Sequence, residues 1–354
     1  MSTSQRVLVT GINGYVGSFV TYEFLKEGYK VRGTVRSVKD TEKYYFVDNF
    51  PNKENLEIVE LDLSNKEEID NAVKGCDFIA HVASPVSFDK NLTWNFFFKS
   101  SVEGCMNILF AAQKYQVKKV VITGSIACMI YNNRKKPTLI NGLPIKIFSE
   151  EDWSDPYQKN IPLYGKGKTL SEQQAWNYYH TLDPNNRFKL TFINPGLVIG
   201  PVFNKDSISS LQYFSFLNGA NEPSGYPDLC HALIDVRDVA KCHRLAIESN
   251  EVDGKRLICV NETLSMQEVS DILRKFYPNI GIPNKMMSHS KLFIYNYFKK
   301  GLEFYLIAWG RKMIFRNNLI KNTLKIENFI DIQKTLKDMM EKLIENKKFG
   351  FGNN

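Results

Sequence analysis

Short apolar runs alternate with longer amphipathic stretches through the first half of the chain. Such runs are typical of buried parallel strands, and the stretches between them have the apolar spacing of helices that pack on a sheet. The pattern predicts strands at residues 6–10, 30–35, 56–61, 77–82, 118–123 and 189–194. It predicts helices at residues 15–26, 66–74, 93–115 and 164–180. This alternation predicts an α/β fold with a Rossmann-type, doubly wound parallel sheet.

The pattern changes after Pro195. Glycines, prolines and aromatic residues mix through residues 196–230, and amphipathic segments follow at 265–276 and 330–346. The chain is also long enough for two lobes that share a cleft. We therefore expect a Rossmann domain at 1–195 with a return segment near 231–245, a smaller mixed lobe at 196–345 and a frayed tail at 346–354.

The composition of the 354 residues is that of a soluble globular protein, with 43% hydrophobic and 24% charged residues. The formal charge is +8, but the lysines are spread along the chain and do not form one stripe with aromatic residues. This distribution favours a solvated basic surface over a face that binds nucleic acid. The six cysteines include no C-x-x-C pair, so we expect buried thiols and neither disulfides nor a metal site.

Two features bear on where the protein works. The first apolar run begins at Arg6 and leaves no room for a signal peptide, so we expect a cytoplasmic protein. Residues 291–315 hold apolar runs on both sides of Lys299 and Lys300, but the longest has six residues and a bilayer crossing needs about twenty. This segment is interpreted either as helices over the substrate cleft or as a helix on a membrane surface. The oligomeric state is left open.

A glycine-rich turn follows the first predicted strand and opens the first predicted helix. Glycines at this place allow a tight turn, a close approach of the backbone to a pyrophosphate, and close packing of helix on strand. The turn therefore predicts that the domain at 1–195 binds a dinucleotide. The candidate cofactor-binding residues are Gly11, Asn13, Gly14, Tyr15, Val16 and Gly17.

The end of the second predicted strand indicates which dinucleotide is bound. An acidic residue there would bind a free ribose 2′-hydroxyl, but the strand ends in Arg36 and Ser37, and the first acid is Asp40. Because a guanidinium pairs well with phosphate, Arg36 favours NADPH over NADH. An alternative is that Arg36 is only an exposed charge. Asp62 and Leu63 end the third strand, where they are expected to contact the adenine, although Asp62 is also a candidate helix N-cap.

A tyrosine and a lysine four residues later lie on one face of a helix, so the ammonium can lower the pKa of the phenol and also hold a ribose. Five such pairs occur in the sequence, and only Tyr164 and Lys168 start a helix between the fifth and sixth predicted strands. Ser125 follows the fifth strand, at the edge of the sheet where ligands bind. Ser125, Tyr164 and Lys168 are therefore the candidate catalytic residues.

Together these residues resemble the extended short-chain dehydrogenase/reductase family, and within it the dihydroflavonol 4-reductase-like group that includes methylglyoxal and cinnamoyl-CoA reductases. Further stretches that carry the resemblance are 81–85, 102–104, 194–201 and 234–240. Two positions depart from the group: Gly124 replaces a common serine, and Asp40 stands where many members have a second basic residue.

The resemblance implies an oxidoreductase that transfers hydride between NADPH and a carbonyl carbon, with Tyr164 as general acid, Lys168 as its electrostatic support and Ser125 on the oxygen. It implies that Val82, Ala83 and Ser84 line the nicotinamide ribose and that Pro195, Gly196, Leu197 and Val198 hold the carboxamide. It also implies that residues 235–240 are structural and tie the two lobes together.

The expected substrate is a small hydrophobic aldehyde or ketone, or the matching alcohol, because the residues expected around it are apolar or aromatic. The candidate pocket residues are Phe88, Ile130, Tyr131 and Leu163. Two enzymatic alternatives from the same superfamily are a 3β-hydroxysteroid dehydrogenase and a nucleotide-sugar epimerase. A further alternative is a regulator that binds the dinucleotide without catalysis, although such proteins usually lose the tyrosine or the lysine.

Overall fold

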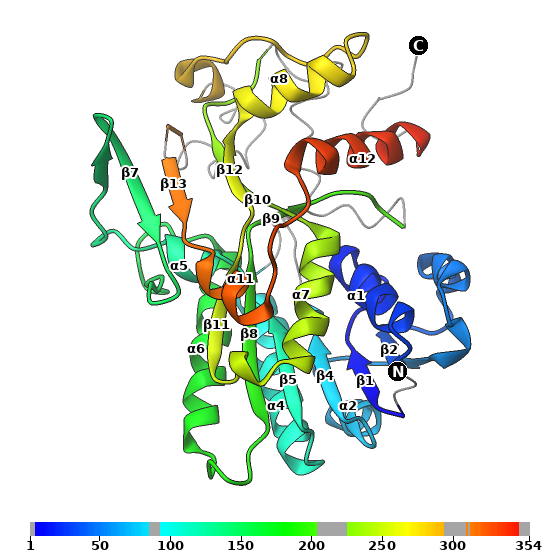
Figure 1. Cartoon of the computed structure of the whole chain (residues 1–354). Helices are drawn as coiled ribbons and strands as arrows, with labels where there is room; N and C mark the ends of the chain where they lie inside the picture. Colours follow the sequence, from blue (N-terminus) through cyan, green and yellow to red (C-terminus); the bar gives the residue numbers. More distant parts are fainter. Residues whose placement is uncertain (1–3, 85–92, 204–224, 294–308, 311, 347–354) are drawn as a thin grey trace.

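The computed structural model describes residues 4–84, 93–203, 225–293, 309–310 and 312–346 (Figure 1). Its largest sheet has seven strands in the order β11-β8-β5-β4-β1-β2-β3, and every neighbouring pair is parallel. The order reverses direction at β1 and β4, which is the mark of a doubly wound sheet. The strands are β1 Arg6–Val9, β2 Lys30–Val35, β3 Leu56–Glu60, β4 Phe78–His81, β5 Lys119–Thr123, β8 Lys189–Pro195 and β11 Lys255–Cys259.

Helices cover both faces of this sheet (Figure 1). Alternate strand residues point to opposite faces. Val7 and Val9 of β1 join an apolar cluster with α1 and α7, while Leu8 joins a second cluster with α2, α4 and α6. The long helices are α1 Tyr15–Lys26, α2 Lys66–Val73, α4 Gly104–Lys114, α6 Leu163–Thr181 and α7 Val236–Glu248.

The predicted α/β fold and its six strands are confirmed, with strand ends that differ by at most one residue. The helix predicted at 93–115 is interrupted: α3 Trp94–Phe97 is followed by a π-helical turn at Phe98–Glu103 before α4 begins. The strand β11 is not predicted by the pattern. Its run is short and follows the irregular stretch, yet it pairs along β8 from Lys255↔Thr191 to Cys259↔Pro195.

Two smaller sheets accompany the main one. Strands β9 Leu197–Ile199, β10 Cys230–Asp235 and β12 Glu262–Ser265 form one mixed sheet, and β6 Thr138–Ile140, β7 Leu143–Phe148 and β13 Lys312–Phe315 form the other. Because β10 lies in a small sheet and β11 in the main one, the chain passes between the sheets more than once. The domain limits 1–195 and 196–345 stay a prediction.

The remaining elements are short helices and the two amphipathic helices expected late in the chain. α8 begins with a capping box, in which the side chains of Ser265 and Glu268 each form a hydrogen bond with the backbone of the other residue. α12 is capped at its N-terminus by the Asp331 side chain, which accepts from the Lys334 backbone N–H. These elements are α5 Ala127–Ile130, α8 Met266–Phe276, α11 Asn318–Leu324, α12 Ile332–Glu345, and the 3₁₀ turns Thr41–Lys43, Tyr45–Asn49, Lys53–Asn55 and Asn250–Val252.

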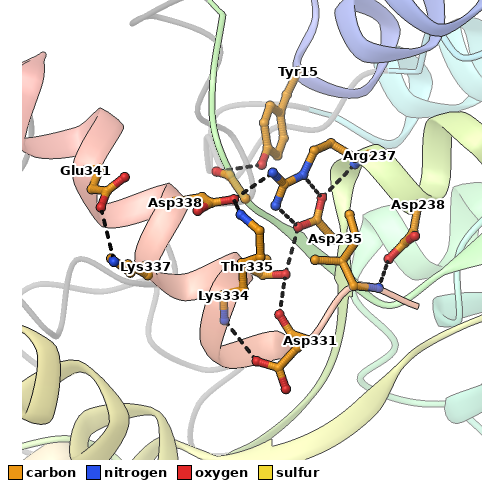
Figure 2. Close-up of polar contacts among 12 residues, drawn as sticks. Tyr15, Asp235, Arg237, Asp238, Asp331, Lys334, Thr335, Lys337, Asp338 and Glu341 are labelled. Carbon is orange, nitrogen blue, oxygen red and sulfur yellow. Dashed lines mark hydrogen bonds and ion pairs between the residues drawn. The ribbon is translucent and has the colours of Figure 1, made fainter. Parts of the chain in front are cut away.

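A buried polar cluster joins α12 to α7 (Figure 2). The carboxylate of Asp235, which has no exposed surface, accepts from the Arg237 backbone N–H at 2.8 Å, from its guanidinium at 2.9 and 2.6 Å, and from the Thr335 hydroxyl at 2.7 Å. Arg237 also donates to Asp338 of α12 at 2.6 Å. Asp238 accepts from the Ile330 backbone N–H. These contacts agree with a structural role for residues 235–240.

Several expected features fall partly outside the described residues. No helix in the described ranges is both long and apolar enough to cross a membrane. The segment 291–315 lies mostly outside these ranges, so both interpretations of it stay open. Within the same ranges no three His, Cys, Asp or Glu side chains gather as a metal site would require. The six cysteines are free thiols, and all except Cys230 are buried.

We predict that Arg237→Ala lowers the free energy of unfolding by about 3–5 kcal/mol, because it leaves the buried Asp235 carboxylate without its cation. Lys334→Ala is the matched control, since Lys334 pairs with the same Asp338 at 2.6 Å but is exposed. This control should cost about 0.5 kcal/mol or less. Urea denaturation measures both, and equal losses in the two variants would contradict the role given to Arg237.

Candidate active site

A cavity of about 840 Å³ opens at the carboxyl ends of β1 to β4. This volume lies within the range of pockets that hold small molecules and cofactors. The predicted residues that line it are Gly11, Asn13, Gly14, Tyr15, Val16, Gly17, Arg36, Asp62, Leu63, Val82, Ala83 and Ser84. The structure therefore brings most of the proposed cofactor-binding residues together around one cavity.

The glycine turn is shaped by close backbone contacts. Gly11 has a φ of +72°, and a Cβ at this residue would lie 3.1 Å from the Cβ of Ala83. A Cβ at Gly17 would lie only 2.1 Å from the carbonyl oxygen of Gly11. No side chain caps α1 at Gly14, so the first N–H groups of the helix are available to an anion. The turn thus has the shape and polarity of a pyrophosphate cradle.

The side chain of Tyr15 does not take part in this cradle. Its hydroxyl donates to the carbonyl oxygen of Gly200 at 3.0 Å, and the ring is buried toward Asp235 and Arg237 (Figure 2). Burial raises the pKa of this phenol, and the Asp235 carboxylate raises it further. Tyr15 is therefore positioned to contact a ligand through its backbone, while its side chain connects α1 to the strands beyond β8.

Charged side chains gather at the opposite end of the cavity. Arg36 lies near Asp62, whose pKa is lowered mainly by two hydrogen bonds from Ser64 and also by the Arg36 charge. Asp62 does not cap α2, because Asn65 does, so its N-cap interpretation is wrong. Lys43, on the first 3₁₀ turn, also lines the cavity and pairs with Asp40 at 2.6 Å.

The structure adds residues that the sequence did not single out. Lys43 supplies a second basic group seven positions after Arg36, whereas many members of the group have theirs four positions after the arginine, where this chain has Asp40. Tyr44 lies beside it, and residues of the interrupted helix reach the cavity from the other side. The lining residues that were missed include Lys43, Tyr44, Phe96, Lys99 and Ser100. A single basic side chain in a predicted turn gives too weak a signal to be found from sequence.

The three candidate catalytic residues converge at the carboxyl end of β5. The Ser125 side chain lies close enough to the Tyr164 phenol to lower the pKa of that phenol. Lys168, one turn further along α6, donates from Nζ to the Thr123 carbonyl oxygen at 2.8 Å. Lys168 lines a small cavity together with Ala83 and Ser84, which also line the large one. Lys168 therefore connects the candidate catalytic set to a small cavity that shares Ala83 and Ser84 with the large one.

Burial dominates the electrostatics of this set. It raises the pKa of Tyr164 to about 12, and the Ser125 side chain acts in the opposite direction. This shift is opposite to the lowering expected from Lys168. Burial also lowers the pKa of Lys168, while Cys128, Cys105 and Glu172 oppose this effect. In the protein alone the phenol therefore keeps its proton at neutral pH.

The segment that follows β4 and includes Val82 and Ala83 is held by Thr10. Its hydroxyl oxygen accepts from both of their backbone N–H groups, at 3.0 and 2.9 Å, and its proton is then directed to Nδ1 of His81 at 3.0 Å. Burial lowers the pKa of His81 to about 3, so this ring is neutral. The hydroxyl of Ser84 is buried without a hydrogen-bond partner among the described residues. It is therefore available to a ligand in either cavity.

Two other sets of predicted residues lie further from the large cavity. Pro195, Gly196, Leu197 and Val198 join β8 to β9 and are not among the residues that line it, so their contact with a carboxamide stays a prediction. In the candidate substrate pocket, the Tyr131 ring packs on Gly165, where a Cβ would lie 2.6 Å from the ring. Leu163 and Tyr131 thus flank Tyr164, Ile130 precedes Tyr131 at the end of α5, and Phe88 lies outside the described residues.

Comparison with known proteins agrees with this geometry. Residues 7–259 match the NAD dependent epimerase/dehydratase family. The chain belongs to this family. It is 31% identical over 285 residues to cinnamoyl-CoA reductase 2 of Medicago truncatula, which covers 79% of each chain. It is 31% identical over 292 residues to the bifunctional dihydroflavonol 4-reductase/flavanone 4-reductase of Malus domestica, which covers 80% of each.

A solved structure extends the likeness to nearly the whole chain. The yeast methylglyoxal/isovaleraldehyde reductase Gre2, complexed with NADPH, superposes with a TM-score of 0.79 at 25% identity, over 98% of this chain and 100% of that one. The predicted membership in the extended short-chain dehydrogenase/reductase family, and in its dihydroflavonol 4-reductase-like group, is confirmed.

We predict that Gly17→Ala lowers the free energy of unfolding by about 1–3 kcal/mol, because the new Cβ overlaps the Gly11 carbonyl and forces the turn to move. Gly281→Ala is the control, since a Cβ there meets nothing within 4 Å. The control should leave the midpoint of thermal unfolding unchanged. Equal midpoints for both variants would mean that the turn is not as tight as described.

Proposed function

We propose that this protein is an NADPH-dependent carbonyl reductase that acts on a small hydrophobic aldehyde or ketone and oxidises the matching alcohol in reverse. The observation that carries the proposal is the convergence of Ser125, Tyr164 and Lys168 beside a cavity with a three-glycine cradle. The reductase names of the relatives support it. They favour a reductase over an epimerase or a 3β-hydroxysteroid dehydrogenase.

The cavity offers groups for each part of the cofactor. The glycine turn and the start of α1 would hold the pyrophosphate, and Asp62 with Leu63 would contact the adenine. Arg36 and Lys43 would bind a 2′-phosphate, which makes NADPH the better fit. Ala83 and Ser84, which border both cavities, would face the nicotinamide ribose. The yeast relative of known structure also holds NADPH.

The chemistry follows from the protonation of the three side chains. Bound NADPH supplies the hydride that reduces the carbonyl carbon. Tyr164 keeps its proton at neutral pH and donates it to the carbonyl oxygen, while the Ser125 hydroxyl orients that oxygen. The Lys168 ammonium, held by the Thr123 carbonyl, stabilises the phenolate that remains. A regulator without catalysis would have no need for this arrangement.

We predict that Tyr164→Phe lowers kcat by about 10²–10⁴-fold, because it removes the hydroxyl group whose proton is transferred to the carbonyl oxygen. NADPH consumption would be followed with a panel of aldehydes, α-dicarbonyls, flavanonols and steroids. Tyr45→Phe is the control, since Tyr45 is half exposed on a 3₁₀ turn away from the catalytic set. A Tyr164→Phe enzyme as fast as the parent would refute the assignment, and a response to steroids alone would support the steroid dehydrogenase instead.

We predict that Arg36→Asp lowers the ratio of kcat/KM for NADPH over NADH by about tenfold or more, because it replaces a phosphate partner with a repelling charge. Lys43→Ala should shift the same ratio in the same direction by a smaller factor. Lys53→Ala is the control, since Lys53 pairs with Asp48 at 3.3 Å and does not line the cavity. If Arg36→Asp left the ratio unchanged, Arg36 would have no part in cofactor choice.

A further inference from the structure

Gly124 is in contact with a buried asparagine. A Cβ added to Gly124 would lie 2.0 Å from Oδ1 and 3.0 Å from Cγ of Asn194. Real Cβ atoms do not approach other atoms so closely, and Asn194 itself is completely buried in β8. The Asn194 carboxamide therefore occupies the space that a side chain at position 124 would need. A side chain at position 124 would therefore displace this carboxamide.

The same oxygen holds the backbone of the catalytic serine. Asn194 Oδ1 accepts from the Ser125 backbone N–H at 2.8 Å. Around this bond the main chain is fixed on both sides, since Gly124 N–H donates to the Ile193 carbonyl at 2.7 Å and Ile126 N–H donates to the Pro195 carbonyl at 3.0 Å. The Asn194 oxygen thus supplies the acceptor for the Ser125 N–H, which lies between these two backbone bonds, and a donor in its place would repel that N–H.

A buried carboxylate sets the direction of that amide. Asn194 Nδ2 donates to Glu172 Oε1 at 3.4 Å, and Glu172 is completely buried on α6, one turn after Lys168. An ionised carboxylate only accepts hydrogen bonds, so the NH₂ end of the amide must face Glu172 and the oxygen must face Ser125. A flipped amide would bring two oxygens together and leave the Ser125 N–H opposite a donor.

Arg256 of β11 holds Glu172 in place. Its guanidinium donates to Oε1 at 2.9 Å and to Oε2 at 3.1 Å, which is the bidentate geometry of a strong pair. Its remaining nitrogen donates to the carbonyl oxygens of Glu150 at 3.0 Å and Asp152 at 2.6 Å. The guanidinium carbon also lies 3.5 Å from the centre of the Trp153 ring. The cation is therefore fixed on every side.

We propose that Asn194, Glu172 and Arg256 form a series of hydrogen-bonded residues, here called the positioning chain, that holds the catalytic Ser125 in place. The absence of a side chain at Gly124 leaves room for the Asn194 amide. The positioning chain extends from Arg256 on β11 through Glu172 on α6 and Asn194 on β8 to Ser125 after β5. This inference rests on the proposed function, because it assigns these three residues to the placement of one of its catalytic groups. A buried ion pair such as Glu172–Arg256 adds little to the free energy of unfolding compared with apolar packing of the same volume. It does, however, keep a carboxylate oxygen in place to accept from the NH₂ group of Asn194.

A double-mutant cycle tests the contact between Gly124 and Asn194. Gly124→Ala pushes the amide away, and Asn194→Ala removes it, so each should lower kcat about ten- to hundredfold and leave the Kd for NADPH within about twofold. In the double variant the new Cβ meets no amide, so its kcat should be no lower than that of Asn194→Ala alone. Losses that multiply in the double variant, or an unchanged kcat in Asn194→Ala, would overturn the proposal.

A second pair of variants tests the role of Glu172. Asn194→Asp keeps the acceptor for Ser125 but places two carboxylates together, so kcat should fall. Adding Glu172→Gln to it removes one of the two facing carboxylates, so kcat of the double variant should rise above that of Asn194→Asp. If the double variant is no faster than Asn194→Asp, Glu172 does not act through the amide. Melting temperatures of all variants identify any that fail to fold.

Amide hydrogen exchange gives a measurement that does not depend on any substrate. Asn194→Ala and Gly124→Ala should both speed exchange in a peptide spanning residues 123–127, whereas Lys53→Ala should not. Unchanged exchange in both variants would overturn the positioning chain even for an enzyme whose substrate is unknown. A parent protein that reduces no carbonyl, together with faster exchange in the variants, would instead contradict the proposed function alone.

Discussion

The parallel register between β5 and β8 is the constraint on which the site depends. Pairing of Thr123 with Ile193 brings the backbone of Ser125 to the side chain of Asn194, and it places the Thr123 carbonyl within reach of Lys168. A slip by one residue would turn every side chain to the opposite face of the sheet. The two apolar clusters oppose such a slip, since alternate strand residues belong to different clusters. The alternation of apolar residues along β5 and β8 thus fixes the strand register, and the register places Ser125, Lys168 and Asn194 together at the carboxyl end of β5.

The buried charged groups in and near the site are each hydrogen-bonded to a partner. Lys168 is held by a carbonyl, Glu172 by a bidentate arginine, and Asp235 by Arg237 and Thr335. An unpaired charge in these places would cost several kcal/mol. The pairs also join segments far apart in the sequence, because Arg256 connects β11 to α6 and Asp338 connects α12 to α7. The ion pairs that give these buried charges a partner therefore also hold β11 against α6 and α12 against α7.

The parts of this arrangement that could be predicted from the sequence are the local ones. Apolar periodicity is a property of neighbouring residues, so six strands and most helices follow from it, and the glycine turn and the Tyr164/Lys168 spacing are local as well. Non-local pairings leave no such trace. The strand β11, the pairing of β13 with β7, the approach of Lys43 to the cavity and the Glu172–Arg256 pair each need the folded chain. The raised pKa of Tyr164 is likewise a consequence of burial that spacing cannot reveal.

The central claim is that hydride reaches a carbonyl carbon held beside Tyr164, and it can be followed atom by atom. NADPH deuterated at C4 of the nicotinamide, in each of its two stereochemical forms, would be incubated with an aldehyde substrate and the alcohol analysed by mass spectrometry. We expect one form to give an alcohol with a single deuterium on the former carbonyl carbon and the other form to give none. An alcohol that carries no deuterium with either form would contradict direct transfer and the arrangement of the site on which it depends.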